Sequence, residues 1–190
     1  MNQEFDLLQV VIQDTARMVF KNLLETHQGE QFYVFALYTD DSLASMYAAA
    51  NSEEGYQRQL DENKKVWGAL GTELGTADLQ ILRWAIVEWA YDFVGKEHFQ
   101  GVDNMLSQVS QNKFEISDEL QIRKAQILNI MIVALRNLDQ EGLFGIGENR
   151  RKVTIFASTS DSNQGFEAEN NSARALNPAS VVQSFIARYE

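Results

Sequence analysis

Apolar residues recur at every third or fourth position near the start of the chain, which is the spacing of an amphipathic helix. We therefore predict a helix over Phe5–His27. Its apolar face consists of Phe5, Leu8, Ile12, Ala16, Val19, Phe20 and Leu23. The next segment, Gln31–Tyr38, is apolar on both alternating faces, as expected for a central strand that is covered on both sides. After a polar turn, Ala44–Asn51 predicts a second strand that forms a β-hairpin with the first.

A polar segment follows, and its start carries the signals of a helix N-terminus. Ser52 is a favourable N-cap residue and the next two residues are acidic, so we predict a helix over residues 52–70. Beyond it, the pattern predicts a third strand over Asp78–Trp84 and a helix over Ile86–Val94. The aromatic residues of this region suit a longer strand equally well.

The second half of the chain adds helices and one strand. The spacing of apolar residues predicts a short helix over Phe99–Val109 and a long, buried helix from Ser117 to Gly142. Lys152–Ser158 alternates and is β-branched, which predicts the last strand. A terminal helix follows, with Asn177 as its N-cap and Pro178 as its first residue.

The order of these elements predicts the fold class. Runs of strands and helices that do not repeat as strand–helix–strand units indicate an α+β protein. We expect one domain over residues 1–190, with an antiparallel or mixed sheet of about four strands and helices packed against it. The only proline, Pro178, lies too close to the C-terminus to belong to a linker between two halves.

Composition and charge exclude several classes of function. The chain has no cysteine, which removes disulfides, thiolate nucleophiles and cysteine-ligated metals. Its net charge of −11 argues against binding to nucleic acid or to an anionic membrane. The N-terminus lacks the basic and apolar regions of a secretion signal, and no apolar stretch is long enough to span a membrane. We therefore expect a cytoplasmic protein that binds neither nucleic acid nor membranes.

Catalytic and metal-binding motifs are missing from the sequence for identifiable reasons. His27 and His98 are the only histidines, and their separation does not fit a local zinc motif. Gly142, Gly145 and Gly147 follow a predicted helix, whereas a dinucleotide-binding loop follows a strand. The setting of a nucleophilic serine is not found either. We therefore expect no catalytic residue, no metal site and no cofactor.

Two further segments invite a chemical interpretation. Asp161–Gly165 resembles the opening of a calcium loop but lacks its spacing, so we interpret it as a turn after the last strand. Arg150, Arg151 and Lys152 form the only basic cluster. This cluster could meet an anionic group, or it could simply be solvated.

The most distinctive run of side chains is Arg83–Tyr91, which combines two tryptophans with an arginine and a glutamate. In one interpretation, Arg83 and Glu88 form a buried ion pair, and Trp84 and Trp89 pack around it to fix a strand-to-helix junction. In the other, these residues line an aromatic pocket in which the guanidinium holds an anionic group. A surface that binds a partner is a third interpretation.

Acidic residues are concentrated in the first third of the chain. Between Thr39 and Asn63, six acids face Arg58 as the only base. They are Asp40, Asp41, Glu53, Glu54, Asp61 and Glu62. A patch of this kind could steer a basic protein partner towards the chain. The alternative is that these acids serve solubility alone.

Several short motifs lie in a characteristic order along the chain. They are Phe32–Tyr38, Arg83–Trp84, Glu88–Trp89 with Tyr91, Phe156–Ser158 and Ala175–Pro178. In this order they resemble a bacterial domain-of-unknown-function family of roughly this length, over nearly the whole chain. The resemblance implies a shared fold. Some families similar to this one occur as immunity proteins beside polymorphic toxins, which implies a role in neutralising a partner.

These observations together favour a non-enzymatic protein-binding module of the immunity type. Its expected partner is a basic protein, such as a toxin, which the six acids would contact. The alternative is an enzyme or a small-ligand-binding protein with a pocket near Arg83 and Glu88. A self-associating structural protein is the third interpretation.

Overall fold

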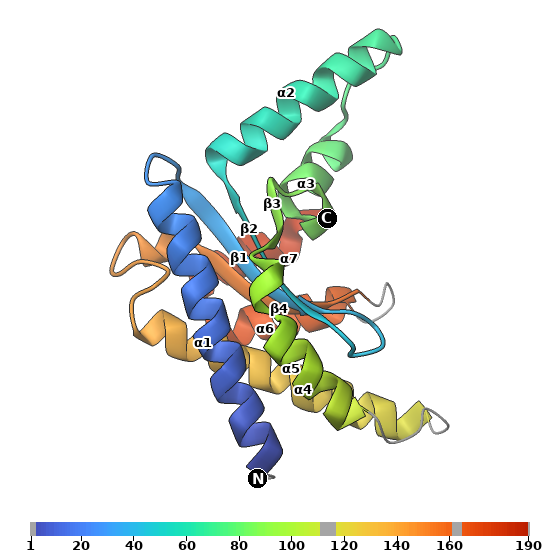
Figure 1. Ribbon diagram of the computed structural model, residues 1–190. Helices are drawn as coiled ribbons and strands as arrows, with labels where there is room; N and C mark the ends of the chain where they lie inside the picture. The colour runs from blue at the N-terminus through green and yellow to red at the C-terminus, as the bar shows by residue number, and fades with distance from the viewer. Residues whose placement is uncertain (1–2, 111–116, 161–164, 190) are drawn as a thin grey trace.

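A four-stranded mixed sheet forms the centre of the molecule (Figure 1). A computed structural model describes residues 3–110, 117–160 and 165–189. The strands are β1 (Phe32–Thr39), β2 (Met46–Ser52), β3 (Tyr91–Val94) and β4 (Thr154–Thr159), in the order β3-β2-β1-β4. β1 pairs antiparallel with β2 and parallel with β4, and β2 pairs antiparallel with β3. The predicted α+β fold with a mixed sheet of four strands is therefore confirmed.

Helices cover both faces of this sheet, which gives three layers (Figure 1). One face carries α1 (Gln3–Thr26), α4 (Gln100–Ser110) and α5 (Ser117–Gln140). The other face carries α7 (Ala179–Ile186) and the end of α3 (Thr76–Trp84). α6 (Gly165–Leu176) runs along the outer edge of β4, and α2 (Glu53–Ala69) leaves the sheet at the end of β2. Short 3-10 segments span Ile86–Glu88, Lys96–His98, Arg150–Lys152 and Ala187–Tyr189.

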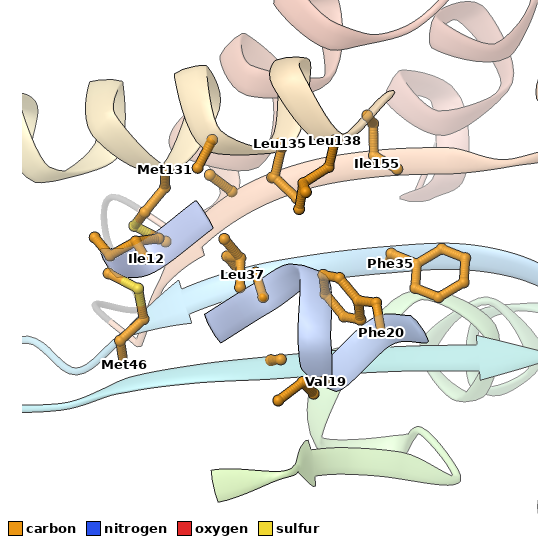
Figure 2. Close-up of a cluster of buried hydrophobic side chains, with 14 of the residues drawn as sticks. Ile12, Val19, Phe20, Phe35, Leu37, Met46, Met131, Leu135, Leu138 and Ile155 are labelled. Atoms are coloured by element: carbon orange, nitrogen blue, oxygen red, sulfur yellow. The ribbon is translucent and has the colours of Figure 1, made fainter. Parts of the chain in front are cut away.

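The side chains of β1 divide between the two apolar layers. Phe35 and Leu37 join the larger core between the sheet and α1, α4 and α5, whereas Val34 and Ala36 join the core beneath α7. Figure 2 shows the larger core, where Phe20 of α1 meets Phe35 edge to face with ring centroids 5.2 Å apart. This burial on both sides confirms that the first strand is central.

The apolar face predicted for the first helix is also confirmed, because all its members except Phe5 are buried. They lie opposite the apolar positions of α5, of which Met131, Leu135 and Leu138 appear in Figure 2. Among the described helices, none combines the length and the apolar character that crossing a membrane requires.

The outer edge of β4 is closed by side chains of the segment that includes α6. The side-chain amide of Asn177 accepts the N–H of Ile155 at 2.8 Å and donates to the carbonyl oxygen of the same residue at 2.6 Å. Ser172 Oγ accepts the N–H of Ala157 at 2.9 Å and lies 2.8 Å from its carbonyl oxygen. These contacts replace a neighbouring strand and block edge-to-edge pairing.

Two predictions for residues 78–94 are wrong. The segment predicted as a third strand is the helix α3, whose start is fixed by the Asp78 carboxylate, which accepts the N–H of Gly75 at 2.8 Å. The segment predicted as a helix contains the short 3-10 turn and then β3. Its aromatic residues follow the strand interpretation, because Tyr91 and Phe93 belong to β3.

Near the C-terminus, the predicted terminal helix is confirmed as α7, although Pro178 stands at its N-cap position rather than its first residue. The helix α6 was not predicted. Of the segment interpreted as a turn, residues 161–164 lie outside the described residues, and Gly165 begins α6. The buried side of α6 is made largely of small and polar residues, including Asn170 and Ser172, so it lacks a strong apolar period.

Candidate functional site

The helices α2 and α3 form an arm, residues 53–84, that projects from the sheet (Figure 1). α2 has 17 residues, of which only Gly55 and Leu60 are buried. It starts directly at the end of β2, where Ser52 caps it by accepting the N–H of Gly55 at 2.8 Å. This confirms the predicted cap. A helix with so little buried surface contributes little to the core, so its exposed side chains are candidates for function.

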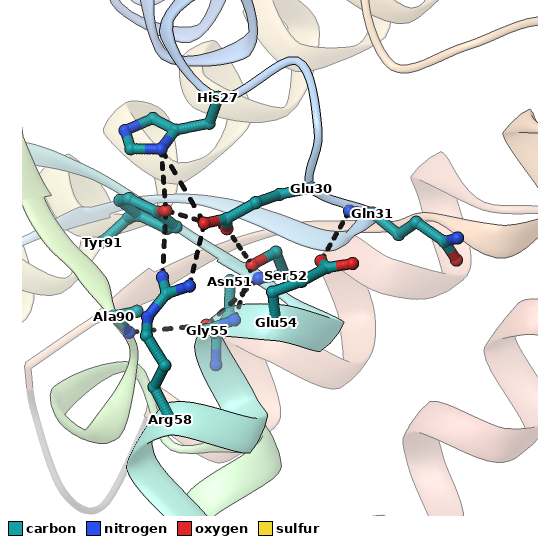
Figure 3. Close-up of polar contacts among 10 residues, drawn as sticks. All are labelled: His27, Glu30, Gln31, Asn51, Ser52, Glu54, Gly55, Arg58, Ala90 and Tyr91. Carbon is teal, nitrogen blue, oxygen red and sulfur yellow. Dashed lines mark hydrogen bonds and ion pairs between the residues drawn. The ribbon is translucent and has the colours of Figure 1, made fainter.

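An anchor network of five side chains ties the base of the arm to the body (Figure 3). Glu30 is its centre. The Glu30 carboxylate accepts hydrogen bonds from the hydroxyl of Ser52, from Arg58 at 2.9 Å and from Tyr91 at 2.8 Å. His27 Nδ1 lies 3.1 Å from the same phenolic oxygen. The network therefore joins the end of α1, β2, α2 and β3 at one point.

The charge on Glu30 is stabilised by these contacts. Burial alone would raise the pKa of this carboxyl, but the hydrogen bonds from Ser52, Arg58 and Tyr91 outweigh burial and hold the pKa below its ordinary value. The carboxylate is therefore the ionised partner of Arg58 at neutral pH. This supports a structural role for the cluster, which fixes where the arm leaves the sheet.

Close packing beneath the first turn of α2 also fixes the arm. A Cβ atom placed on Gly55 would lie 2.6 Å from Asn51 Oδ1 and 2.9 Å from the Cβ of Ala90. Asn51 is fully buried, donates to the hydroxyl of Tyr33 at 3.0 Å and accepts the N–H of Ser52 at 3.1 Å. Only glycine leaves room for α2 to approach this amide so closely.

Arg83, at the base of the arm, does not form the ion pair with Glu88 that one interpretation of the sequence proposed. Its guanidinium forms a two-pronged ion pair with Glu53, with nitrogen–oxygen distances of 3.0 and 2.6 Å. The reason is the position of the two carboxylates: α3 places Arg83 beside the first turn of α2, which carries Glu53, whereas Glu88 lies in the following 3-10 turn. These hydrogen bonds outweigh burial and raise the pKa of Arg83. The guanidinium carbon also lies 4.1 Å from the ring centroid of Tyr33, within cation–π range.

The tryptophans of this segment have separate places. Trp89 is buried, and its indole N–H donates to the carbonyl oxygen of Arg83 at 3.1 Å. Trp84 packs edge to face against Tyr33 and Phe185. A hollow of about 330 Å³ opens beside Arg83 and Trp84, and its lining does not include Glu88 or Trp89. Of the four residues predicted to form a pocket, the structure therefore brings two to the hollow.

The six acids predicted to bind a partner do not form one patch. The β1–β2 hairpin places Asp40 and Asp41 at the opposite end of these strands from Glu53 and Glu54. Asp40 accepts the hydroxyl of Ser42 at 2.8 Å within the turn. Asp41 forms an ion pair with Lys124 of α5, whose side chain is only 7% exposed.

The other four acids lie on the arm, and two of them are engaged at its base. Glu53 pairs with Arg83, and Glu54 accepts the N–H of Gln31 at 2.7 Å. Asp61 and Glu62 are exposed farther along α2. Within the described ranges, neither of these two carboxylates pairs with a cation.

Exposed apolar side chains on the arm are the feature that sequence reasoning missed. Val66 is 60% exposed and Leu70 is 74% exposed, at the far end of α2. Between α2 and α3 lies a hollow of about 430 Å³, lined in part by Leu60, Trp67 and Leu79. The sequence does contain a signal for this surface, because apolar residues occur at the end of a helix that is otherwise polar.

Arg150, from the predicted basic cluster, has a structural role. Arg150 is buried, pairs with Asp139 and donates to the carbonyl oxygens of Val153 at 2.6 Å and Leu176 at 3.0 Å. It therefore holds the start of β4 to the helices around it.

Over the described ranges, no group of three or more histidine, aspartate or glutamate side chains is placed to hold a metal ion.

Comparisons with known proteins give one match. No curated protein and no solved structure matches the chain. A family described as a domain of unknown function, DUF4303, matches residues 12–178. This match takes in the whole sheet, the arm and most of the helices. The resemblance to a domain-of-unknown-function family is thus confirmed, and the chain belongs to the DUF4303 family.

Proposed function

We propose that this protein is a binding module whose arm contacts a protein partner. The observation that carries the proposal is the exposed apolar surface at the far end of α2, where Val66 and Leu70 gain nothing from the core. Exposed apolar patches on soluble proteins mark interaction sites. The arm also starts without a linker at β2, so its position is fixed before a partner arrives, which reduces the entropy lost on binding.

The charge of the chain supports a basic partner. The net charge is −11, and Asp61 and Glu62 stand exposed on the same helix as the apolar residues, next to the exposed Lys64 and Lys65. The attraction for a basic partner therefore comes from the charge of the chain as a whole. Long-range attraction of this kind accelerates association, whereas apolar contacts hold the complex together. A toxin is the partner class implied by the immunity-type families that the motifs resemble, and the interface proposed here suits such a partner.

The test begins with affinity capture from the native host, followed by binding measurements on the purified pair. Replacing Val66 and Leu70 by serine should weaken binding more than tenfold, because each buried aliphatic side chain contributes about 1.5–3 kcal/mol. The matched control replaces Leu7 and Val10 of α1, which are 57% and 52% exposed, and should leave affinity unchanged. If the arm variant binds as tightly as the wild type, the proposal is wrong.

A second pair of substitutions separates steering from contact. Asp61→Asn with Glu62→Gln should slow association and flatten its salt dependence, with little change in the dissociation rate.

Co-expression of the captured partner with the wild-type protein or with the arm variant then tests the immunity role. A partner whose toxicity the wild-type protein relieves and the arm variant does not would support it. Relief that is equal in both would contradict it.

A further inference from the structure

The hollow beside Arg83 and Trp84 has the chemistry of an anion site. It has a volume of about 330 Å³ and lies where the start of β4, the end of α3 and α7 meet. Its basic side chains are Arg83, Arg151 and Lys152, and Glu53 is its only carboxylate. In a chain with a net charge of −11, three cations against one acid make this lining an exception.

One of these cations is unpaired. Arg83 is bound to Glu53, and Arg151 forms an exposed ion pair with Glu148 at 3.0 Å. The side chain of Lys152 is exposed, and its ammonium group makes no ion pair or hydrogen bond with any residue in the described ranges. A ligand can therefore take up its charge without breaking an internal contact.

Three hydroxyl groups complete the lining, on Thr154, Ser180 and Ser184. None of them hydrogen bonds to another residue in the part of the chain that the structure describes. Thr154 is only 5% exposed as a residue, and it contributes to the lining of the hollow. The two serines lie one helical turn apart on α7 and so share a face of that helix. Hydroxyl groups without a partner inside the protein can donate to a ligand oxygen without breaking an internal hydrogen bond.

We propose that this hollow binds a small molecule through an oxyanion, either a phosphate or a carboxylate. Lys152 supplies the charge, and the three hydroxyls donate hydrogen bonds to the anionic oxygens. Trp84 lines the same hollow and offers apolar surface for the rest of the ligand. This site is separate from the apolar end of the arm, so either proposal can fail without the other.

The test is a titration of the full-length protein followed by nitrogen–proton NMR correlation spectra. The probes are inorganic phosphate, adenosine 5′-monophosphate and succinate, each added to about 10 mM, which covers weak millimolar binding. We expect saturable shifts confined to residues at the start of β4 and in α7. Comparison of the two phosphates with succinate distinguishes a phosphate site from a carboxylate site.

Variants locate the binding groups. Lys152→Gln and Thr154→Val should each weaken binding by about tenfold, the effect of one lost hydrogen bond to a charged group. Thr154→Ser keeps the hydroxyl and should bind as the wild type does, which separates a loss of the donor from a disturbance of β4. Lys96→Gln, at another exposed lysine, is the charge-matched control and should have no effect. The proposal is overturned by the absence of saturable shifts, or by shifts that survive both weakening variants.

Discussion

Replacing Asn177 tests whether side chains stand in for a strand at the edge of the sheet. Asn177→Leu keeps the approximate volume of the side chain and removes its amide. The native amide accepts the N–H of Ile155, donates to the carbonyl oxygens of Ile155 and Ala173, and accepts a hydrogen bond from Arg150 at 3.2 Å. All four contacts disappear in the variant.

The size of the effect follows from what is left behind. Ile155 is fully buried, so its N–H and C=O groups have no access to water when the amide is gone. Each unsatisfied buried group costs about 1–3 kcal/mol. The free energy of unfolding should therefore fall by about 3–5 kcal/mol, a large part of the 5–15 kcal/mol that is usual for a domain of about this size.

Urea unfolding followed by tryptophan fluorescence measures this change. The control is Asn171→Leu, because Asn171 is an exposed residue of α6, the helix that ends just before Asn177. Among the described residues, its side chain hydrogen bonds only with Arg174, at 3.1 Å. It should change the free energy of unfolding by less than about 0.5 kcal/mol. Asn177→Asp, which keeps the acceptor oxygens and loses the donors, should fall between the two. Equal losses for Asn177→Leu and Asn171→Leu would refute the reasoning.

Two further substitutions test local features. Gly95 has φ +60°, and a Cβ atom there would lie 2.7 Å from Val19 Cγ2, so Gly95→Ala should lower the free energy of unfolding by about 1–3 kcal/mol. Gly101→Ala, where nothing lies within 4 Å, should cause no loss in the same urea assay. Glu30→Gln should destabilise at pH 7. Because the folded-state pKa of Glu30 is lowered, the stabilisation by its charge is present above the unfolded value of about 4.3 and is lost as the pH falls through the folded value. Urea unfolding at pH 7 and at pH 3 measures the loss of unfolding free energy caused by Glu30→Gln. An equal loss at both pH values would contradict this pH dependence.

The elements that the sequence predicts well are those whose burial is apolar and local. Residues 5–27 repeat with a helical period because one face of α1 packs on the sheet. β1 is apolar at nearly every position because it has helices on both sides. In each case the nearest neighbours in the sequence carry the information, so no knowledge of distant contacts is needed.

Two of the errors occur where distant polar contacts decide the structure. α6 is held along β4 by Ser172 and, just beyond its end, Asn177, whose partners lie 15 and 22 positions away in the sequence. Polar residues in such positions do not produce an apolar periodicity, so a helix held in this way is not predicted from the spacing of apolar residues. The same holds for Arg83, which pairs with Glu53 at a separation of 30 residues rather than with nearby Glu88. Neither partner can be chosen from spacing alone.

The candidate sites show why a count of charges in the sequence is a poor guide to a binding surface. Folding assigns four of the six acids of the predicted patch to structural tasks: Glu53 is bound to Arg83, Glu54 to the backbone of Gln31, Asp41 to Lys124, and Asp40 to the hydroxyl of Ser42. Buried or shared charges of this kind contribute less to an external field than free ones. Only charged groups that are not engaged in this way are available to a partner. On the arm these groups are the carboxylates of Asp61 and Glu62, on the same helix as its exposed apolar residues. At the hollow beside α7 the available group is the ammonium of Lys152. The two surfaces therefore differ in the chemistry they offer, and a partner protein and a small anion can bind the same molecule without competing for the same groups.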